Sequence, residues 1–224
     1  MMETTSTRFY FLLRRLATLL AVVTLTLSLI ATVTGTLLAF NYEPTAGGAY
    51  SSIDRIIDQI ADGWLVKNLH DITGSGLIGI SLIQLVVMFL GRQFRRSWLT
   101  GWISGIALTL TAIGLSWTAM ILDWTQLGYW RLSIELGTVE AIPLIGPTLR
   151  EILTGGGAIA TTTVERLYTI HSYVLPVGAI ILAIIHLGGL LIQEVEQKQL
   201  QAALSSPQPE KEQANRSDKL QSPV

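Results

Sequence analysis

Four apolar segments, each long enough to cross a lipid bilayer, set the strongest limit on how this chain can fold. They are predicted at 16–40, 72–90, 98–122 and 173–193, since a spanning helix needs about 20 mostly apolar residues. Half of the 224 residues are hydrophobic and 14% are charged, which is typical of an integral membrane protein. Helices are the natural way to satisfy the backbone in lipid. We therefore expect an all-α membrane protein built as a four-transmembrane-helix bundle.

The positions of Lys and Arg predict how the bundle is oriented. Positive charge gathers before the first segment, between the second and third, and after the fourth: Arg8, Arg14, Arg15, Arg92, Arg95, Arg96, Lys198, Lys211, Arg216 and Lys219. The positive-inside rule puts both termini on the cytoplasmic or stromal side, called here the n side; the opposite side is the p side. The predicted layout is a basic N-terminus (1–15), the bundle (16–193) and a polar, disordered tail (194–224). The first segment is too long for a cleaved signal peptide.

The two p-side loops are expected to carry short surface helices. Apolar residues at 53, 56, 57, 60 and 64 have helical spacing, with acids on the other face, and predict a helix capped by Ser51 or Ser52 and ended by Gly63. The loop over 123–169 predicts two short helices split by Pro and Gly. A loop of this length with apolar pieces is expected to fold back over the p-side end.

Composition excludes several kinds of chemistry. There is no cysteine, so disulfides, thiolate metal sites and thioether-linked haem are excluded. The net charge is −1, and no nucleic-acid partner is expected. There is no nucleophile–base pair, phosphate loop or acid cluster with metal spacing, which argues against a stand-alone enzyme.

The three histidines are the residues that point to a cofactor. His70 and His171 stand at the p-side starts of the second and fourth segments, which run in the same direction, so their imidazoles should lie at one depth. A single histidine at a helix start is more often an interfacial polar residue. A depth-matched pair in a bundle, however, can hold haem iron axially. The pair predicts a bis-histidine haem near the p surface.

A second, incomplete site is predicted deeper in the bundle. His186 lies fifteen residues after His171, roughly 22 Å further in and turned by about 60°. At matching depth on the second segment stands Gln84, fourteen residues after His70. Two interpretations are open: His186 is a metal ligand, or it is hydrogen-bonded to Ser, Thr or Gln84 inside the bundle.

Small residues repeat the same fourteen-residue spacing. Ala21 and Gly35 on the first segment form one such pair, and Gly105 and Ala119 on the third form another. They would leave room for a flat macrocycle between helices. Ordinary small-residue packing between membrane helices is the alternative.

Several short motifs resemble the cytochrome b family, most closely its four-helix b6 type, and they extend over about 10–193. They are Phe40-Asn41-Tyr42-Glu43-Pro44-Thr45, Ala49-Tyr50-Ser51-Ser52, Gly63-Trp64-Leu65, Gly128-Tyr129-Trp130, Glu140-Ala141-Ile142-Pro143 and Val174-Leu175-Pro176. The family carries two histidines on each of the second and fourth helices. The fourth helix matches with His171 and His186, but the second matches only with His70.

The resemblance implies roles for particular residues at the p side. His70 and His171 would bind a haem b, with Arg166 and Lys67 near its propionates. Gly35 and Gly105 match two of the four packing glycines of the family, and alanines replace the other two.

The departures from the family are concentrated on the n side. Gln84 replaces a ligand of the second haem, which leaves three outcomes: no second haem, a haem bound by His186 alone, or a weak ligand role for Gln84. Leu19 stands where the b6 type has the cysteine of its covalently bound haem, so no covalent haem c is expected.

The expected function is that of a membrane-bound haem b electron carrier in a thylakoid or bacterial plasma membrane. Its partners would be other subunits of an electron-transfer complex, a quinone and a second copy of the chain. Two alternatives are a haem-poor structural or assembly subunit, and a quinone-binding module that uses the pocket around Gln84 and His186.

Overall fold

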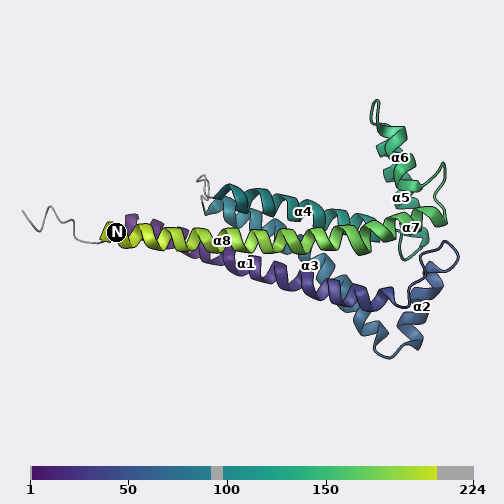
Figure 1. Cartoon of the computed structure of the whole chain (residues 1–224), viewed down its shortest axis with the longest axis horizontal. Helices are drawn as coiled ribbons and strands as arrows, with labels where there is room; N and C mark the ends of the chain where they lie inside the picture. The colour runs from purple at the N-terminus through teal and green to yellow at the C-terminus, as the bar shows by residue number, and fades with distance from the viewer. Residues whose placement is uncertain (1, 92–97, 206–224) are drawn as a thin grey trace, which may run out of the picture.

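Four long helices lie side by side and make up most of the protein. The computed structural model describes residues 2–91 and 98–205. The long helices are α1 (Met2–Ala39), α3 (Gly63–Leu90), α4 (Leu99–Ala119) and α8 (Leu175–Ser205) (Figure 1). No β-strand occurs within these described ranges. The basic turn predicted around 92–96 lies outside them.

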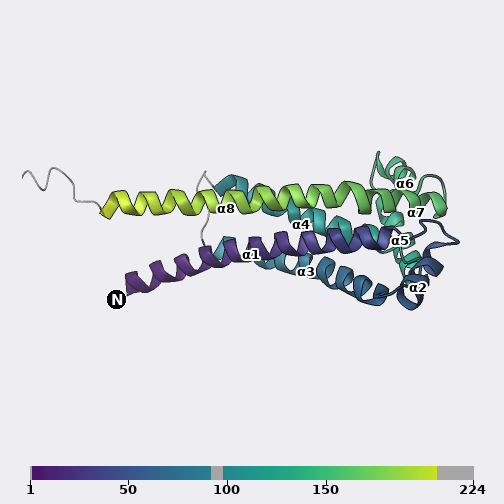
Figure 2. The ribbon, with the colours of Figure 1, turned by 60° about the horizontal axis from the view of Figure 1, so that its bottom comes forward.

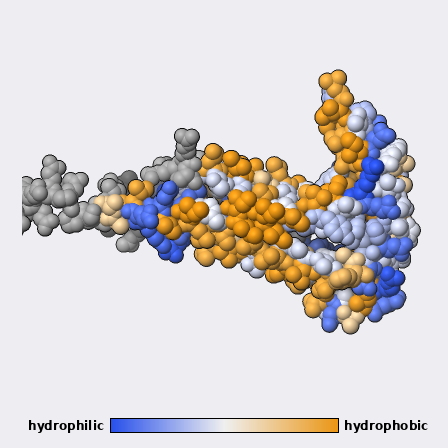
Figure 3. Space-filling model, viewed as in Figure 1, coloured by the Kyte–Doolittle hydropathy of each residue, from blue (hydrophilic) through white to orange (hydrophobic). Residues whose placement is uncertain are grey.

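The outer surface of the bundle is apolar, as a lipid-facing surface must be. The segments with the length and hydropathy to cross a membrane are Phe9–Ala39, Gly63–Leu90, Leu99–Ala119 and Thr161–Leu200. Figure 3 shows the apolar band in the middle of the molecule, with polar residues at both ends. The protein is thus a multi-pass, all-α integral membrane protein, as predicted.

Shorter helices gather at one end, which is the predicted p-side end. They are α2 (Ala49–Gln59), α5 (Gln126–Glu140), α6 (Gly146–Thr154) and α7 (Thr161–Thr169). The start of α1 and the end of α8 lie at the opposite end (Figures 1 and 2). These two helix ends therefore lie on the same side of the bundle.

The loop before the last spanning helix differs from the prediction in two ways. It contains three short helices rather than two, because α7 continues directly into the spanning segment. It also does not wholly fold over the end of the bundle. α6 packs on α5 and α7 and projects to the side (Figure 1).

The boundaries of α2 and α3 correct the prediction for the first p-side loop. Gly63 does not end α2. It begins α3, nine residues before the predicted start, because it packs so closely on α2 that an added Cβ would lie 1.8 Å from the carbonyl oxygen of Ile56. The N-cap of α2 is Gly48. Ser51 and Ser52 do not cap it, since their hydroxyls donate to the carbonyls of Gly48 and Ala49.

The n-side end of α8 is also longer than predicted. Disorder was expected from residue 194, but the helix continues to Ser205. Side chains of α1 hold this end: Arg14 donates to Gln197 (2.7 Å) and Thr18 donates to Glu194 (3.2 Å). The rest of the predicted tail, residues 206–224, lies outside the described part of the chain.

Candidate functional site

His70 and His171 face each other at the p-side end of the bundle. Their ring centroids are 6.2 Å apart and the ring planes are inclined at 68°. Two metal–imidazole bonds of about 2 Å in line, with about 1 Å from each nitrogen to its ring centre, add up to roughly 6 Å. The separation therefore matches two axial imidazole ligands on one iron atom, and the pair fits a haem.

The Nδ1 atom of each of these two rings is held by the neighbouring helix. For His70 the partners are the Ala31 carbonyl (3.0 Å) and the Thr34 hydroxyl (3.2 Å) of α1. For His171 they are the Leu115 carbonyl and the Thr118 hydroxyl of α4, both at 3.0 Å.

These contacts determine which nitrogen carries the proton. A carbonyl oxygen can only accept, and both hydroxyls donate to their own helix, Thr34 to Ile30 and Thr118 to Gly114. Nδ1 is therefore the N–H donor in each ring, and Nε2 keeps its lone pair. A neutral imidazole held through Nδ1–H in this way can bind a metal ion through Nε2, and the hydrogen bond from Nδ1 fixes the orientation of the ring.

His186, deeper in the bundle, has the same support but a different partner. Its Nδ1 contacts the Gly101 carbonyl (2.9 Å) and the Ser104 hydroxyl (3.1 Å) of α4. Its Nε2 accepts a direct hydrogen bond from the Gln84 side-chain amide. In this structure His186 is thus hydrogen-bonded to Gln84 and to Ser104.

The glycines predicted to make room do lie against imidazoles. A Cβ added to Gly35 would lie 2.9 Å from Cε1 of His70, and one added to Gly105 would lie 2.8 Å from Cε1 of His186. Ala21 is buried in an apolar cluster near the n side, and Ala119 is the last residue of α4. The glycines of α3 at 74 and 79 face open space.

One local arrangement recurs behind all three histidines. A backbone carbonyl receives Nδ1–H, a hydroxyl follows three residues later, and a small residue follows directly. The sets are Ala31/Thr34/Gly35, Gly101/Ser104/Gly105 and Leu115/Thr118/Ala119. Sequence reasoning missed the three hydroxyl residues. The signal was present, because a Thr or Ser directly precedes each of these small residues.

The fifteen-residue interval between His171 and His186 is accommodated by a π turn. Residues Ile170–Val174 form this turn, in which the Leu175 N–H bonds to the Ile170 carbonyl. Pro176 has no N–H to offer the Ser172 carbonyl, so a regular α-helix is disfavoured here. The turn takes up one residue, and the interval becomes equivalent to the fourteen residues between His70 and Gln84.

The two basic residues expected near haem propionates have protein partners. Lys67 pairs with Asp71 (2.8 Å) and Asp123 (3.6 Å), which ties the start of α3 to the chain after α4. Arg166 donates to the carbonyls of Glu151 and Ile152 at the end of α6. Both side chains lie at the p-side end, and a contact with propionates stays a prediction.

Tyr42 links the p-side loops just outside the spanning segments. Its hydroxyl donates to the Leu122 carbonyl (2.7 Å), and its ring lies 5.2 Å from that of Tyr168. Burial raises the pKa of Tyr42 well above its ordinary value of 10.0, with smaller contributions from Asp123 and Tyr168. The phenol therefore acts as a neutral donor that holds the α1–α2 connection to the end of α4.

These features define a class of protein: a four-helix membrane bundle with two facing imidazoles that fit one haem iron. The sequence model of the family described as cytochrome b/b6/petB matches residues 9–195. Cytochrome b6 of Synechococcus elongatus is 32% identical over 154 residues, covering 69% of this chain and 72% of that protein. Cytochrome b6 of Cyanidium caldarium is 34% identical over 163 residues, covering 73% and 76%. The chain belongs to the cytochrome b/b6 family.

A solved structure supports the fold. A chain of a hyperthermophilic respiratory complex III superposes with a TM-score of 0.67 at 23% identity. The match covers 79% of this chain and 47% of that one, so this protein spans about half the length of its structural relative.

Proposed function

We propose that this protein is a membrane-bound haem b electron carrier whose haem is held between His70 and His171. The observation that carries the proposal is the 6.2 Å separation of the two rings, together with the Nδ1 contacts that leave both Nε2 atoms available as ligands. Bis-histidine ligation by two strong-field imidazoles favours low-spin iron.

The haem would supply reversible one-electron oxidation and reduction. The protein side chains fix the two ligands and keep them neutral. Thr34 and Thr118 accept hydrogen bonds from the imidazoles, and the apolar surroundings keep the local dielectric low. Because both ligand rings are held by neighbouring helices, little rearrangement is needed when the charge at the site changes.

Electron exchange is expected at the p-side end. His70 lies one turn after Lys67 and next to Asp71, at the end of the bundle that carries the short helices. The polar cluster formed by Lys67, Asp71 and Asp123 marks this end as the water-exposed approach to the ligand pair. We propose that partner subunits of an electron-transfer complex approach from here.

A reduced-minus-oxidised spectrum of the purified full-length protein in detergent tests this function. We expect a b-type α band that disappears in His70→Ala and in His171→Ala but persists in His186→Ala. Circular dichroism must show that each variant remains helical. A helical wild-type protein with no haem would refute the proposal and favour the alternative of a structural subunit.

The other alternative, a quinone-binding module at Gln84 and His186, has less support. Both side chains are almost fully buried and bind each other directly. A quinone carbonyl could reach His186 only by displacing the Gln84 amide. We therefore favour the electron carrier, and expect quinone analogues not to perturb the His186 imidazole signals.

A further inference from the structure

We propose that this protein has a single haem, because Gln84 and His186 form a sealed polar contact at the n-side site. Electrons would then enter and leave at the p-side end only. The inference rests on the proposed haem between His70 and His171.

The first support is the geometry opposite His186. At the p side, the ring centroids of His70 and His171 are 6.2 Å apart, which leaves room for an iron atom bound to both rings. At the n side, the Gln84 amide bonds directly to Nε2 of His186. The one lone pair that His186 could offer to iron is thus already occupied. The two residues are 2% and 1% exposed, so the contact is enclosed by the bundle.

The second support is that Gln84 is anchored rather than free to turn aside. Its amide nitrogen also donates to the Ala17 carbonyl (3.3 Å), and its oxygen accepts from Thr24 (3.3 Å). Every polar atom of this amide thus has a partner inside the membrane. Breaking these contacts in hydrocarbon would leave buried polar groups unsatisfied, which is strongly unfavourable.

The third support is a difference between the residues behind Gln84 and those behind the three histidines. Behind each histidine, a carbonyl is followed three residues later by Thr or Ser and then by a small residue. The equivalent set behind Gln84 is Ala17, Leu20 and Ala21. This set has the carbonyl and the small residue but no hydroxyl, at the one position where no imidazole Nδ1 needs an acceptor. The surroundings of Gln84 therefore suit an amide and lack the hydroxyl that accompanies each imidazole of this chain.

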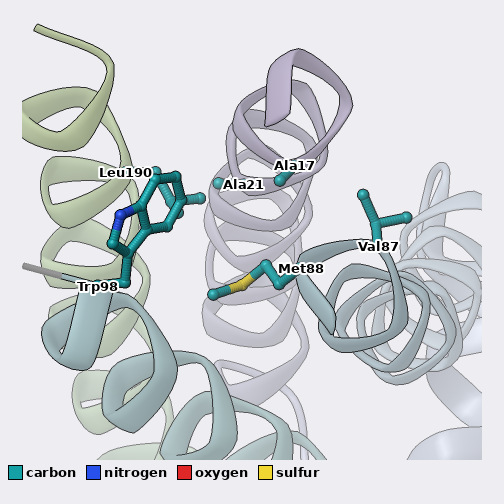
Figure 4. Close-up of a cluster of buried hydrophobic side chains, with 6 residues drawn as sticks. All are labelled: Ala17, Ala21, Val87, Met88, Trp98 and Leu190. Carbon is teal, nitrogen blue, oxygen red and sulfur yellow. The ribbon is translucent and has the colours of Figure 1, made fainter. Parts of the chain in front are cut away.

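The fourth support is the packing one turn closer to the n side. Met88 and Leu190 lie four residues after Gln84 and His186, and they pack with Trp98 in a buried cluster. Figure 4 shows Met88 extending between the helices toward Trp98, with Ala17 and Ala21 on the neighbouring helix. This side-chain packing closes the n-side half of the bundle beneath the Gln84–His186 contact.

A single p-side haem changes what the protein can do. Carrying an electron across the membrane requires a second carrier near the n side, and the residues there do not fit one. The electron donor and the acceptor must both reach the p-side end. The protein would thus relay electrons along one membrane surface.

The test is the number of haems per chain in purified full-length protein, measured as pyridine haemochrome against quantitative amino-acid analysis. We expect one haem per chain, a redox titration with a single one-electron wave, and no loss of haem in His186→Ala. A wild-type value of two, with two waves, overturns the inference but leaves the proposed function intact. A value of zero refutes the proposed function itself.

The double variant Leu20→Thr/Gln84→His supplies a second imidazole ligand and a hydroxyl to accept from its Nδ1. We expect haem content to rise from one to two per chain, with a second redox wave. The matched control is Gln193→His, which places a histidine at another buried glutamine, two turns after His186 on α8. The haem content of this variant should stay at one per chain. If the double variant keeps its first haem and its helicity but gains no second, Gln84 and Leu20 are not what closes the site.

Discussion

Gly35 of α1 lies directly against the imidazole of His70 on α3, so close that a methyl group at this glycine would approach Cε1 to 2.9 Å. The ring cannot retreat easily, because its Nδ1 is held by the Ala31 carbonyl and Thr34. The position of the His70 ring is therefore set by a backbone on another helix.

Gly35→Ala should weaken haem binding. The added methyl group must push the His70 ring or separate α1 from α3, a strain of about 1–3 kcal/mol. We expect faster loss of haem to an apoprotein acceptor and a lower melting temperature. Gly74→Ala, where an added Cβ meets nothing within 4 Å, should do neither. Gly105→Ala should lower the melting temperature without changing haem retention, since it crowds His186.

Thr118→Val should raise the midpoint potential of the haem. Hydrogen bonding from Nδ1 makes His171 a more basic ligand, which favours ferric iron, and the valine removes one acceptor. One hydrogen bond is worth about 1 kcal/mol, so the expected rise is on the order of 40 mV for a one-electron couple. Thr109→Val is the control, because the Thr109 hydroxyl bonds within its own helix to Gly105. An unchanged potential in the Thr118 variant would count against haem ligation by His171.

Lys67→Met should lower the same potential. It removes a positive charge one turn from His70 and leaves Asp71 and Asp123 without their cation, which favours the more positive ferric state. The fall should be larger at low ionic strength, because salt screens charges near the surface. Arg131→Met, which breaks a similar ion pair with Glu135 on α5, should leave the potential unchanged. Equal shifts in the two variants would exclude a local effect of Lys67.

Tyr42 should make the fold sensitive to alkali. Its pKa is raised in the folded state above 10.0, so its contribution to stability is complete below pH 10. As the pH rises further, only the unfolded phenol ionises, and the free energy of unfolding falls by up to about 1.4 kcal/mol per pH unit. Tyr42→Phe loses the bond to Leu122, about 1 kcal/mol at neutral pH. Melting curves from pH 8 to 11 should show a shallower alkaline decline in the variant than in the wild type.

Helical periodicity predicted the features that depend on how deep a residue lies in the membrane and on the direction in which its helix crosses it. Residues that enter parallel helices at one level must meet, and the structure does bring His70 to His171 and Gln84 to His186. The four spans follow in the same way from length and hydropathy. These predictions need only the geometry of a helix and the thickness of a bilayer.

The features that the sequence did not predict depend on contacts between helices that are far apart in the chain or separated by a turn. Gly63 begins α3 because of its packing on Ile56, whereas by itself a glycine after an amphipathic stretch predicts an end. Ser51 and Ser52 looked like caps, but the helix starts one turn earlier. Thr34 and Thr118 could not be assigned to imidazoles without knowing which carbonyl each ring reaches.

The π turn around His171 has a consequence for how such proteins are found. By absorbing one residue, it allows the interval between His171 and His186 to exceed the interval between His70 and Gln84 on α3, while the residues of each pair still meet at one level. Pattern searches that require equal intervals on the two helices would pass over this protein. A search that tolerates one inserted residue before a proline, and accepts glutamine fourteen residues after the first histidine, would detect it.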